Sequence, residues 1–328
     1  MNISKIENSK SIISIIIPLY NEEQCVIELI KKLNDLNNNK KYVFEFLIID
    51  DGSVDKTNTV LQENINSLPN SKIITFTKNF GQTAALSAGI NNSNGETIVT
   101  MDGDLQNDIS DIPVLIENLN KGYDTVCGWR KNRLDGYISR VFPSKIANWI
   151  ISKISGVYLH DYGCTLKAYK RSILENVKLY GEMHRFIPIY VAWQGGKILE
   201  IPVKHNKRQL GKSKYGILRS FSVIADLIFL KFMEKQFSNP IHIFGGFGVV
   251  NFILSISSFL LMVYYKYFGN KSFIETPLPE LTILFFLIGT LSIFIGLIAE
   301  IIIRTYFESQ NVLPYVIKKS QEKLKMKI

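Results

Sequence analysis

Two long apolar runs near the C-terminal end constrain the fold of this chain more than any other feature. Residues 241–265 contain no charged side chain, and residues 281–303 contain one, Glu300. About 20 apolar residues are enough to cross the hydrocarbon core of a bilayer as a helix. Paired runs with tyrosines at one edge are more typical of membrane helices than of buried helices in a soluble core. We therefore expect a transmembrane hairpin over residues 241–304, with helices at about 241–265 and 281–303.

The segments beside the hairpin predict its orientation. Residues 214–240 combine apolar side chains at helical spacing with charged ones, which fits an amphipathic helix in the membrane interface or, equally, a helix packed on a soluble domain. Residues 305–328 are rich in lysine, and basic tails beside a span usually lie on the cytoplasmic side. Residues 1–10 are polar and lack the apolar core of a signal peptide. We expect a multi-pass protein of the cytoplasmic membrane, with its N-terminal domain and both termini in the cytoplasm.

The net charge of +9 predicts an anionic partner. Nucleic acid, an anionic membrane surface and a phosphorylated substrate are the classes that such a charge attracts. Much of the excess lies in the lysine-rich tail, next to the predicted membrane surface, so we expect a lipid bilayer and phosphorylated substrates as partners and no nucleic acid. The three cysteines are far apart and lack paired metal spacing, so neither a disulfide framework nor a zinc site is expected.

Residues 1–213 alternate short apolar runs with helical patterns, as a soluble α/β domain does. Four runs are predicted to be buried strands, and each is bounded by polar or turn residues: 12–17, 43–49, 72–76 and 96–101. Residues 22–36 and the segment after Asp55 show helical spacing of apolar residues. Strands and helices that alternate through short links predict a doubly wound, mostly parallel sheet with helices on both faces.

Polar side chains follow each of the four predicted strands. In sheets of this kind, ligands bind beyond the carboxyl ends of the strands, so we expect these side chains to form one site. The four clusters are Tyr20, Asn21 and Glu22; Asp50, Asp51, Gly52 and Ser53; Lys78 and Asn79; and Asp102, Gly103 and Asp104.

The segment after the fourth strand, MDGDLQND, predicts a metal site. Asp102 and Asp104 are two residues apart and project to the same side while the chain stays extended, and Gln106 can add an amide oxygen. Mg²⁺ and Mn²⁺ prefer oxygen ligands and leave positions for substrate phosphates. The alternative is a simple polar turn, because Asp and Gly are common turn residues.

Two common nucleotide-binding loops are missing from the sequence. No Gly-x-Gly-x-x-Gly follows the first predicted strand, which disfavours a dinucleotide-dependent oxidoreductase. Gly211, Lys212 and Ser213 are similar to the end of a P-loop, but the leading glycine is absent from the residues before them. The strand-end clusters therefore need another explanation.

An ordered series of motifs resembles the family 2 glycosyltransferases of the GT-A fold. The motifs are IIIPLYNEE, IIDDGSVDKT, TKNFGQTAAL, MDGDLQNDISDIP, DYGCTLKAYKR, MHRFIP and KRQLGKSKYG. Within that family the set is similar to the polyprenyl-phosphate glycosyltransferases, which include dolichol-phosphate mannose synthases, bacterial polyprenyl-phosphate glucosyltransferases and the undecaprenyl-phosphate aminoarabinose transferase. The resemblance extends from Ile12 through the C-terminal hairpin.

The resemblance implies a role for each group of polar residues. The nucleotide-sugar site would comprise Pro18, Tyr20, Asn21, Glu22, Asp50, Asp51, Lys78, Asp102 and Gly103. A Mg²⁺ or Mn²⁺ ion on the donor diphosphate would be bound by Asp102, Asp104 and Gln106. The phosphate of a polyprenyl acceptor, undecaprenyl or dolichyl, would be contacted by Arg130, Arg140, Ser144, Arg208, Ser213 and Lys214. The loop between Arg130 and Arg140 is short compared with the family pattern. The family resemblance also implies homo-oligomers.

The implied reaction is an inverting attack of a lipid-phosphate oxygen on the anomeric carbon of a nucleotide sugar, with a UDP-sugar favoured over GDP-mannose. Both reactants are anionic, so a metal ion and the nearby cations would offset their repulsion. A phosphate is ionised at neutral pH and needs no strong general base, so Asp161 is expected to position the substrate. The candidate catalytic residues are thus Asp102, Asp104 and Asp161.

Two alternatives stay open. The first is a glycosyltransferase with another membrane acceptor, a glycolipid or a polysaccharide; chain-extending synthases are expected to have more spans and a Gln-x-x-Arg-Trp segment, which this sequence lacks. The second is a non-catalytic membrane protein that binds nucleotide sugar. Such a protein is expected to lose part of the Asp102, Asp104 and Gln106 set, and all three residues are present.

Overall fold

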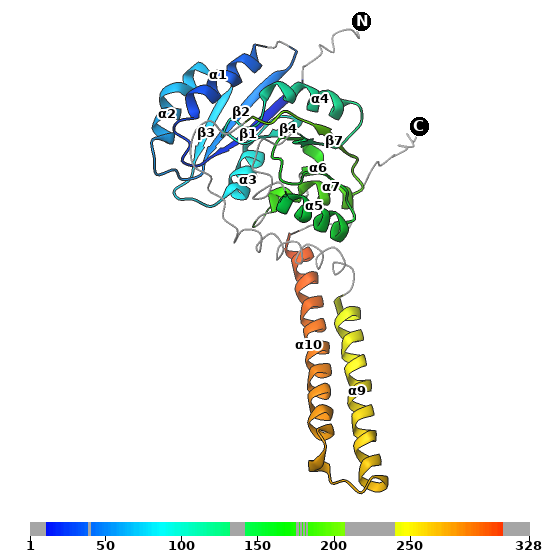
Figure 1. The fold of residues 1–328 in the computed structure, drawn as a ribbon. Coiled ribbons are helices and arrows are strands. Elements are labelled where there is room, and N and C mark those ends of the chain that lie inside the picture. The colour runs from blue at the N-terminus through cyan, green and yellow to red at the C-terminus, as the bar shows by residue number, and fades with distance from the viewer. Residues whose placement is uncertain are drawn as a thin grey trace, which may run out of the picture. The chain divides into compact units, whose positions relative to one another are not determined.

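The computed structural model describes residues 11–38, 41–131, 142–174, 177, 179, 181, 183–206 and 240–310. The chain divides into two compact units, Met1–Ile228 and Phe229–Ile328. The first unit contains a sheet with its helices, and the second contains two long helices (Figure 1). The predicted interfacial segment before residue 240 and the tail beyond residue 310 lie outside the described residues, so the predicted domain boundaries at 213, 240 and 304 stay predictions.

Seven strands form one mixed sheet in the first unit, in the order β3-β2-β1-β4-β6-β5-β7. The first four strands are parallel neighbours, β6 is antiparallel to both β4 and β5, and β5 is parallel to β7. Their bounds are β1 Ile12–Leu19, β2 Val43–Asp50, β3 Ser71–Thr75, β4 Thr97–Thr100, β5 Thr125–Trp129, β6 Lys167–Lys170 and β7 Ile198–Pro202. The mostly parallel sheet and its four predicted strands are therefore confirmed.

Helices cover both faces of this sheet (Figure 1). One face packs against α1 (Val26–Asn37), α2 (Thr57–Asn64) and α4 (Ile112–Asn120). The other face packs against α3 (Gln82–Asn92), α6 (Arg171–Leu174) and α7 (Ile187–Trp193). Further elements are α5 (Phe142–Ser155) and the short 3-10 helices η1 (Ile65–Ser67), η2 (Ile109–Asp111) and η4 (Met183–Arg185).

The β1 strand shows why the apolar runs of this domain do not alternate with polar residues. Ile15 and Ile17 pack in the core on one face of the sheet, and Ile16 packs in the core on the other. All three side chains are completely buried. Burying a side chain of this size contributes about 1.5–3 kcal/mol, so a strand covered on both faces is apolar at most positions.

The strand register brings the predicted polar clusters to one edge. Leu19 at the end of β1 lies opposite Asp50 at the end of β2, and Asp50 lies opposite Thr75 at the end of β3. Two backbone bonds continue the pairing past these ends, because the Asp51 N–H donates to the Leu19 carbonyl and the Phe76 N–H donates to the Asp50 carbonyl. The carboxyl ends of the three strands therefore meet.

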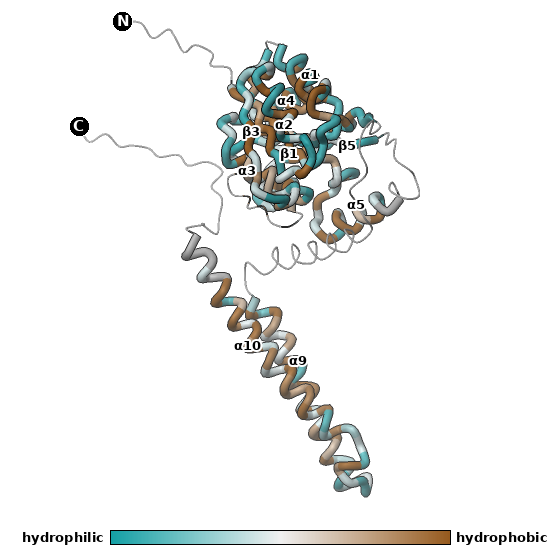
Figure 2. Tube along the Cα trace, turned by 90° about the vertical axis from the view of Figure 1, so that its left-hand side faces the viewer, coloured by the Kyte–Doolittle hydropathy of each residue, from teal (hydrophilic) through white to brown (hydrophobic). Residues whose placement is uncertain are grey.

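The second unit is a hairpin of two long apolar helices, α9 (Pro240–Phe268) and α10 (Leu278–Gln310), with η5 (Phe273–Glu275) between them. Figure 2 shows their predominantly hydrophobic colouring. The most apolar stretch is only 22% buried in α9 and 17% buried in α10, whereas a core helix of a soluble protein would be mostly buried. Both helices are long and apolar enough to cross a membrane, as predicted.

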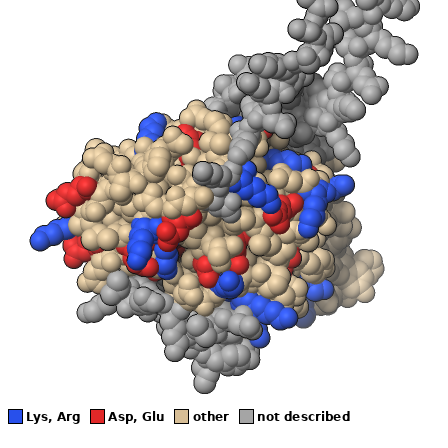
Figure 3. All heavy atoms as spheres, turned by 90° about the horizontal axis from the view of Figure 1, so that it is seen from above, with Lys and Arg blue, Asp and Glu red and all other residues tan. Residues whose placement is uncertain are grey.

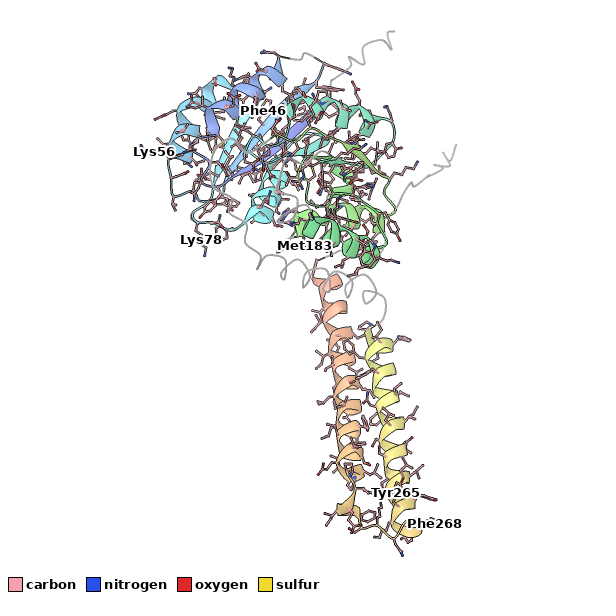
Figure 4. All side chains as sticks on the ribbon, in the orientation of Figure 1. Phe46, Lys56, Lys78, Met183, Tyr265 and Phe268 are labelled. Carbon is pink, nitrogen blue, oxygen red and sulfur yellow. The ribbon has the colours of Figure 1, made fainter. Side chains whose placement is uncertain are left out.

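Small residues allow the two helices of the hairpin to approach closely. A Cβ atom on Gly248 would lie 2.9 Å from the carbonyl oxygen of Gly289, so neither position has room for a side chain. Ser255 donates a hydrogen bond of 2.8 Å from Oγ to the carbonyl of Thr282 across the interface. Close backbone approach and such polar contacts are the usual basis of helix association in lipid. Figure 4 shows Tyr265 at the connecting end of α9.

Candidate active site

Hydrogen bonds join the polar clusters that follow β1 and β2. Asn21 adopts a positive φ of 50°, and its N–H donates to Ser53 Oγ at 2.9 Å. Its side-chain Oδ1 accepts a bond of 2.8 Å from the Val54 N–H. The next residue, Glu22, donates its N–H to Thr57 Oγ1 at 2.8 Å. The two loops therefore form one surface at the sheet edge, and Asn21 and Glu22 brace it.

Two buried carboxylates have different partners: Asp50 is the last residue of β2, and Asp51 directly follows it. Asp50 Oδ2 accepts a bond of 2.8 Å from the Asn58 amide. Asp51 accepts the N–H groups of Phe80 at 2.7 Å and Gly81 at 2.9 Å. Burial raises the pKa of Asp51, and these two N–H groups oppose the rise. Asp51 thus fixes the loop between β3 and α3, a role that the sequence did not predict.

A hollow with a volume of about 410 Å³ lies at the edge of β2 and β3. Small-molecule sites commonly enclose about 300–1,000 Å³. The lining includes Tyr20, Asp50 and Lys78, three of the predicted nucleotide residues, and Figure 4 shows Lys78 at this edge of the domain. Gly52 also lines the hollow with a φ of 65°, and a Cβ atom there would lie 2.3 Å from the backbone carbon of Lys78. Only glycine therefore permits this approach of the two loops.

The remaining predicted nucleotide residues lie outside the lining of the hollow. Pro18 is part of β1, opposite Ile49. Asn21 and Glu22 hold the loop after β1, and Asp51 holds the loop before α3. The last two, Asp102 and Gly103, belong to the segment after β4.

The three predicted metal ligands lie in the segment after β4, where buried and partly exposed residues alternate. From Met101 to Ile109, buried residues alternate with partly exposed ones, and Asp102, Asp104 and Gln106 are all partly exposed. The intervening Gly103 is buried, and a Cβ atom on it would lie 2.1 Å from Leu19 Cδ2. The segment therefore packs tightly on the end of β1 and presents its polar side chains away from it.

Cations and hydrogen-bond donors surround the carboxylate of Asp102. Its Oδ1 accepts a bond of 2.7 Å from the Nε2 of Gln82, the first residue of α3. Burial raises the pKa of Asp102, while a hydrogen bond from Thr165 and the charges of Arg130 and Arg185 oppose the rise. Arg185 was not predicted as a site residue; its signal in the sequence was the MHRFIP motif.

The residues after β4 fit a hard divalent cation. Within the described ranges, no three or more His, Cys, Asp or Glu side chains come together as a metal cluster. An ion at Asp102 and Asp104 would thus have two carboxylate ligands at most and would need amide, water or phosphate oxygens for the rest. Mg²⁺ is held in this way at nucleotide sites, by one or two carboxylates and the substrate phosphates.

Arg130 and Asp161 form a buried ion pair. Arg130 directly follows β5, and its Nε and Nη2 donate to Asp161 Oδ2 at 2.7 Å and Oδ1 at 2.9 Å. The two side chains are only 15% and 4% exposed. Burial alone would lower the pKa of Arg130, but the charge and hydrogen bonds of Asp161 hold it above its ordinary range. The sequence suggested separate roles for the two residues, and the structure joins them.

Two further buried contacts brace the site and were not predicted. Lys167 in β6 is fully buried, and its Nζ donates to the carbonyl of Tyr162 at 3.1 Å. Burial lowers the pKa of Lys167, and the charge of nearby Asp161 opposes this. Thr83 in α3 and His184 in η4 share a buried hydrogen bond of 2.7 Å between Oγ1 and Nδ1. Figure 4 shows Met183, next to this histidine, at the lower edge of the domain.

The predicted acceptor residues are only partly described. Arg130 is in the ion pair, and Ser144 lies in the first turn of α5, where it is partly exposed. Four others lie outside the described residues: Arg140, Arg208, Ser213 and Lys214. On the face drawn in Figure 3, the described lysines and arginines are interspersed with aspartates and glutamates.

Comparisons with known proteins agree with this architecture. The profile of the family described as Glycosyl transferase family 2 matches residues 14–178. Dodecaprenyl-phosphate galacturonate synthase from Rhizobium johnstonii is 39% identical over 310 residues, which cover 93% of this chain and 92% of the relative. Undecaprenyl-phosphate 4-deoxy-4-formamido-L-arabinose transferase from Klebsiella pneumoniae is 34% identical over 296 residues, which cover 90% of this chain and 89% of the relative.

A solved structure shares the fold of the first unit. Glucosyl-3-phosphoglycerate synthase from Mycobacterium tuberculosis, crystallised with Mn²⁺, uridine diphosphate and glucosyl-3-phosphoglycerate, superposes with a TM-score of 0.54 and 15% identity. The match covers 68% of this chain and 80% of that one. At this identity the likeness establishes the fold alone.

Proposed function

This chain belongs to glycosyl transferase family 2 and is a glycosyltransferase, and from this premise we propose that it transfers a sugar from a nucleotide diphosphate donor to a polyprenyl phosphate. The observation that carries the proposal is that its relatives are named as enzymes that act with polyprenyl phosphates. Two of them, at 39% and 34% identity over at least 89% of their length, are named for different sugars and for polyprenyl-phosphate acceptors. Both names give a polyprenyl phosphate, which supports this class of acceptor, and their different sugars leave the sugar to experiment.

The hollow at the β2–β3 edge is the proposed nucleotide site. Its size suits a nucleoside, Tyr20 and Lys78 line it, and we assign these two side chains to a base and a phosphate. A UDP-sugar is the favoured donor, with GDP-mannose as the alternative. Asp102 and Asp104, with Gln106, are the proposed ligands of a Mg²⁺ or Mn²⁺ ion, which would supply positive charge to the leaving nucleotide diphosphate.

The proposed reaction is a single displacement. An oxygen of the lipid phosphate forms a bond to the anomeric carbon, and the bond from that carbon to the donor diphosphate breaks with its electron pair. The nucleoside diphosphate leaves, and the anomeric configuration inverts. The attacking phosphate is already ionised at neutral pH, so the chain needs no strong general base.

The Arg130–Asp161 pair suggests how the chain receives the acceptor. A guanidinium has five N–H donors, and Asp161 accepts from two separate nitrogens of Arg130. This bidentate contact occupies one edge of the guanidinium and fixes its plane, so that the remaining N–H groups keep one orientation. We assign Arg130 to the acceptor phosphate, together with Ser144 and the predicted Arg140, Arg208, Ser213 and Lys214. Asp161 positions Arg130. It does not need to abstract a proton, because the attacking phosphate is already ionised.

The proposed setting is a membrane with the first unit in the cytoplasm. The two apolar helices support membrane insertion, and the lysine-rich tail after α10 supports cytoplasmic termini. A polyprenyl acceptor is confined to the bilayer, so an anchored enzyme meets it at the membrane surface. A multi-pass topology with both termini on one side follows from two spans.

A transfer assay tests this function. Purified protein is incubated with undecaprenyl phosphate, Mg²⁺ or Mn²⁺ and a panel of labelled UDP- and GDP-sugars, and the lipid is extracted. We expect label in the lipid from at least one donor, loss of label with a chelator, and loss in Asp104→Asn. Asp108→Asn is the matched control, because Asp108 lies in the same segment but caps η2 through the Ser110 N–H. No labelled lipid from any donor, while an authentic relative is active alongside, would favour a non-catalytic nucleotide-sugar-binding protein.

A further inference from the structure

A glutamate in β7 holds the backbone of the segment that contains Asp161. Glu200 Oε1 accepts the N–H of Asp161 at 2.9 Å. Its Oε2 accepts the N–H of His160 at 3.0 Å and contacts His160 Nδ1 at 2.7 Å. The Glu200 side chain is 10% exposed, whereas that of His160 is 67% exposed. One buried carboxylate therefore binds two consecutive backbone N–H groups.

This contact replaces the secondary structure that the segment lacks. Residues 157–166 belong to neither a helix nor a strand, so no ladder of backbone bonds fixes the peptide groups at residues 160 and 161. Hydrogen bonds from N–H groups to a carboxylate are about twice as strong as those between neutral groups. Glu200 holds the N–H of the 160–161 peptide, whose carbonyl accepts a bond of 2.7 Å from Asn148 Nδ2, and it thereby helps to set the direction in which the Asp161 side chain leaves the backbone.

The sheet brings Glu200 and Arg130 to the same segment. The strands β5 and β7 are parallel, with Glu200 opposite Cys127, and Arg130 follows the end of β5. The last residue of β5, Trp129, stacks on the His160 ring with 4.2 Å between ring centroids and 20° between planes. Arg130 binds the side chain of Asp161, and Glu200 binds its backbone.

We propose that Glu200 is a positioning residue for sugar transfer, which acts by holding Asp161 in bidentate contact with Arg130. The proposal rests on the roles of Arg130 and Asp161 in the proposed function. A bidentate contact needs both carboxylate oxygens in line with Nε and Nη2, so a rotation of the 160–161 peptide breaks at least one bond. Arg130 then loses its orientation toward the acceptor phosphate.

Steady-state kinetics of the full-length protein in lipid nanodiscs test this role. Glu200→Ala is expected to lower kcat on the order of 10²-fold, the loss that a misplacement of about 1 Å can cause. The KM for the nucleotide sugar is expected to stay near the wild-type value, because the hollow at β2 and β3 is untouched. Glu200→Gln keeps one acceptor oxygen and is expected to recover part of the loss.

A double variant separates positioning from general damage. If Glu200 acts through Asp161, Glu200→Ala adds little to the loss already caused by Asp161→Asn. Multiplication of the two losses would overturn the proposal. The matched control is Asp124→Ala, which removes a carboxylate at the opposite end of β5 and β7 that accepts the Lys197 N–H at 2.8 Å and pairs with Lys170. It is expected to lower the melting temperature and leave kcat unchanged.

Hydrogen–deuterium exchange tests the same contact without relying on activity. Glu200→Ala is expected to speed exchange of the amides at residues 160 and 161, and Asp124→Ala is expected to leave them at the wild-type rate. Unchanged exchange in Glu200→Ala would overturn the proposal. If the wild type transfers no sugar from any donor, the proposed function fails, and the exchange rates still decide whether Glu200 holds the backbone at residues 160 and 161.

Discussion

Loss of Arg130 is expected to destabilise the first unit far more than the loss of a surface charge. The Arg130 and Asp161 side chains are 15% and 4% exposed, and two hydrogen bonds of 2.7 and 2.9 Å join them. Arg130→Met leaves the Asp161 carboxylate buried without its cation. Removing one partner of a buried pair costs about 3–5 kcal/mol.

This cost can be expressed as a melting temperature. In a domain of roughly 150–250 residues, 1 kcal/mol shifts the midpoint by about 2–4 °C, so Arg130→Met is expected to lower it by roughly 6–20 °C. Thermal unfolding of the detergent-solubilised protein, followed by tryptophan fluorescence, measures the shift. Trp129 lies next to the pair and reports on this region. Lys131→Met is the matched control, because its side chain is exposed and its Nζ lies 5.6 Å from the centroid of the Trp129 ring.

Replacing both partners separates the ion pair from ordinary packing. Arg130→Met combined with Asp161→Leu removes both charges of this pair, and such replacements are often neutral. The double variant is therefore expected to melt above Arg130→Met. The reasoning would be refuted if Arg130→Met and Lys131→Met melted at the same temperature. It would also be refuted if adding Asp161→Leu to Arg130→Met lowered the melting temperature further.

Three other predictions concern close contacts. Gly52→Ala adds a Cβ 2.3 Å from the Lys78 backbone and is expected to weaken UDP binding, measured by calorimetry. The control is Gly122→Ala, because Gly122 also has a positive φ but has free space around its Cβ position; this variant is expected to cost only about 1–3 kcal/mol of backbone strain. Thr83→Val removes the buried bond to His184 and is expected to cost about 1–3 kcal/mol, measured by thermal unfolding. Gly248→Leu is expected to separate α9 from α10 and to speed proteolysis of the hairpin. Gly246→Leu is the control and is expected to leave the proteolysis rate unchanged, because a Cβ at Gly246 would have open space around it.

The parts of the fold that were predictable have local signals. Nearly continuous apolar runs identify β1 and β2, because a strand buried on both faces is apolar at most positions. The strand β6 has no such signal, since it is four residues long with lysine at both ends. Its antiparallel insertion between β4 and β5 depends on long-range pairing, which a local pattern does not contain.

The candidate site divides in the same way. Clusters such as Asp50–Ser53 follow strands directly, so the rule for parallel sheets brings them to one edge. The partners of Asp161 are 31 and 39 positions away, at Arg130 and Glu200, and only the packed sheet joins them. The helix predicted from residue 22 begins at Val26, because Asn21 to Cys25 form the turn that binds the β2 loop.

The mass of the lipid product tests the central claim most directly. Undecaprenyl phosphate is incubated with the purified protein, metal ion and the donor that the panel identifies, and the extracted lipid is measured by mass spectrometry. The account predicts a lipid with one sugar and one phosphate, formed with release of a nucleoside diphosphate. A lipid with one sugar and two phosphates, formed with release of a nucleoside monophosphate, would contradict it, because that product requires attack on phosphorus instead of the anomeric carbon.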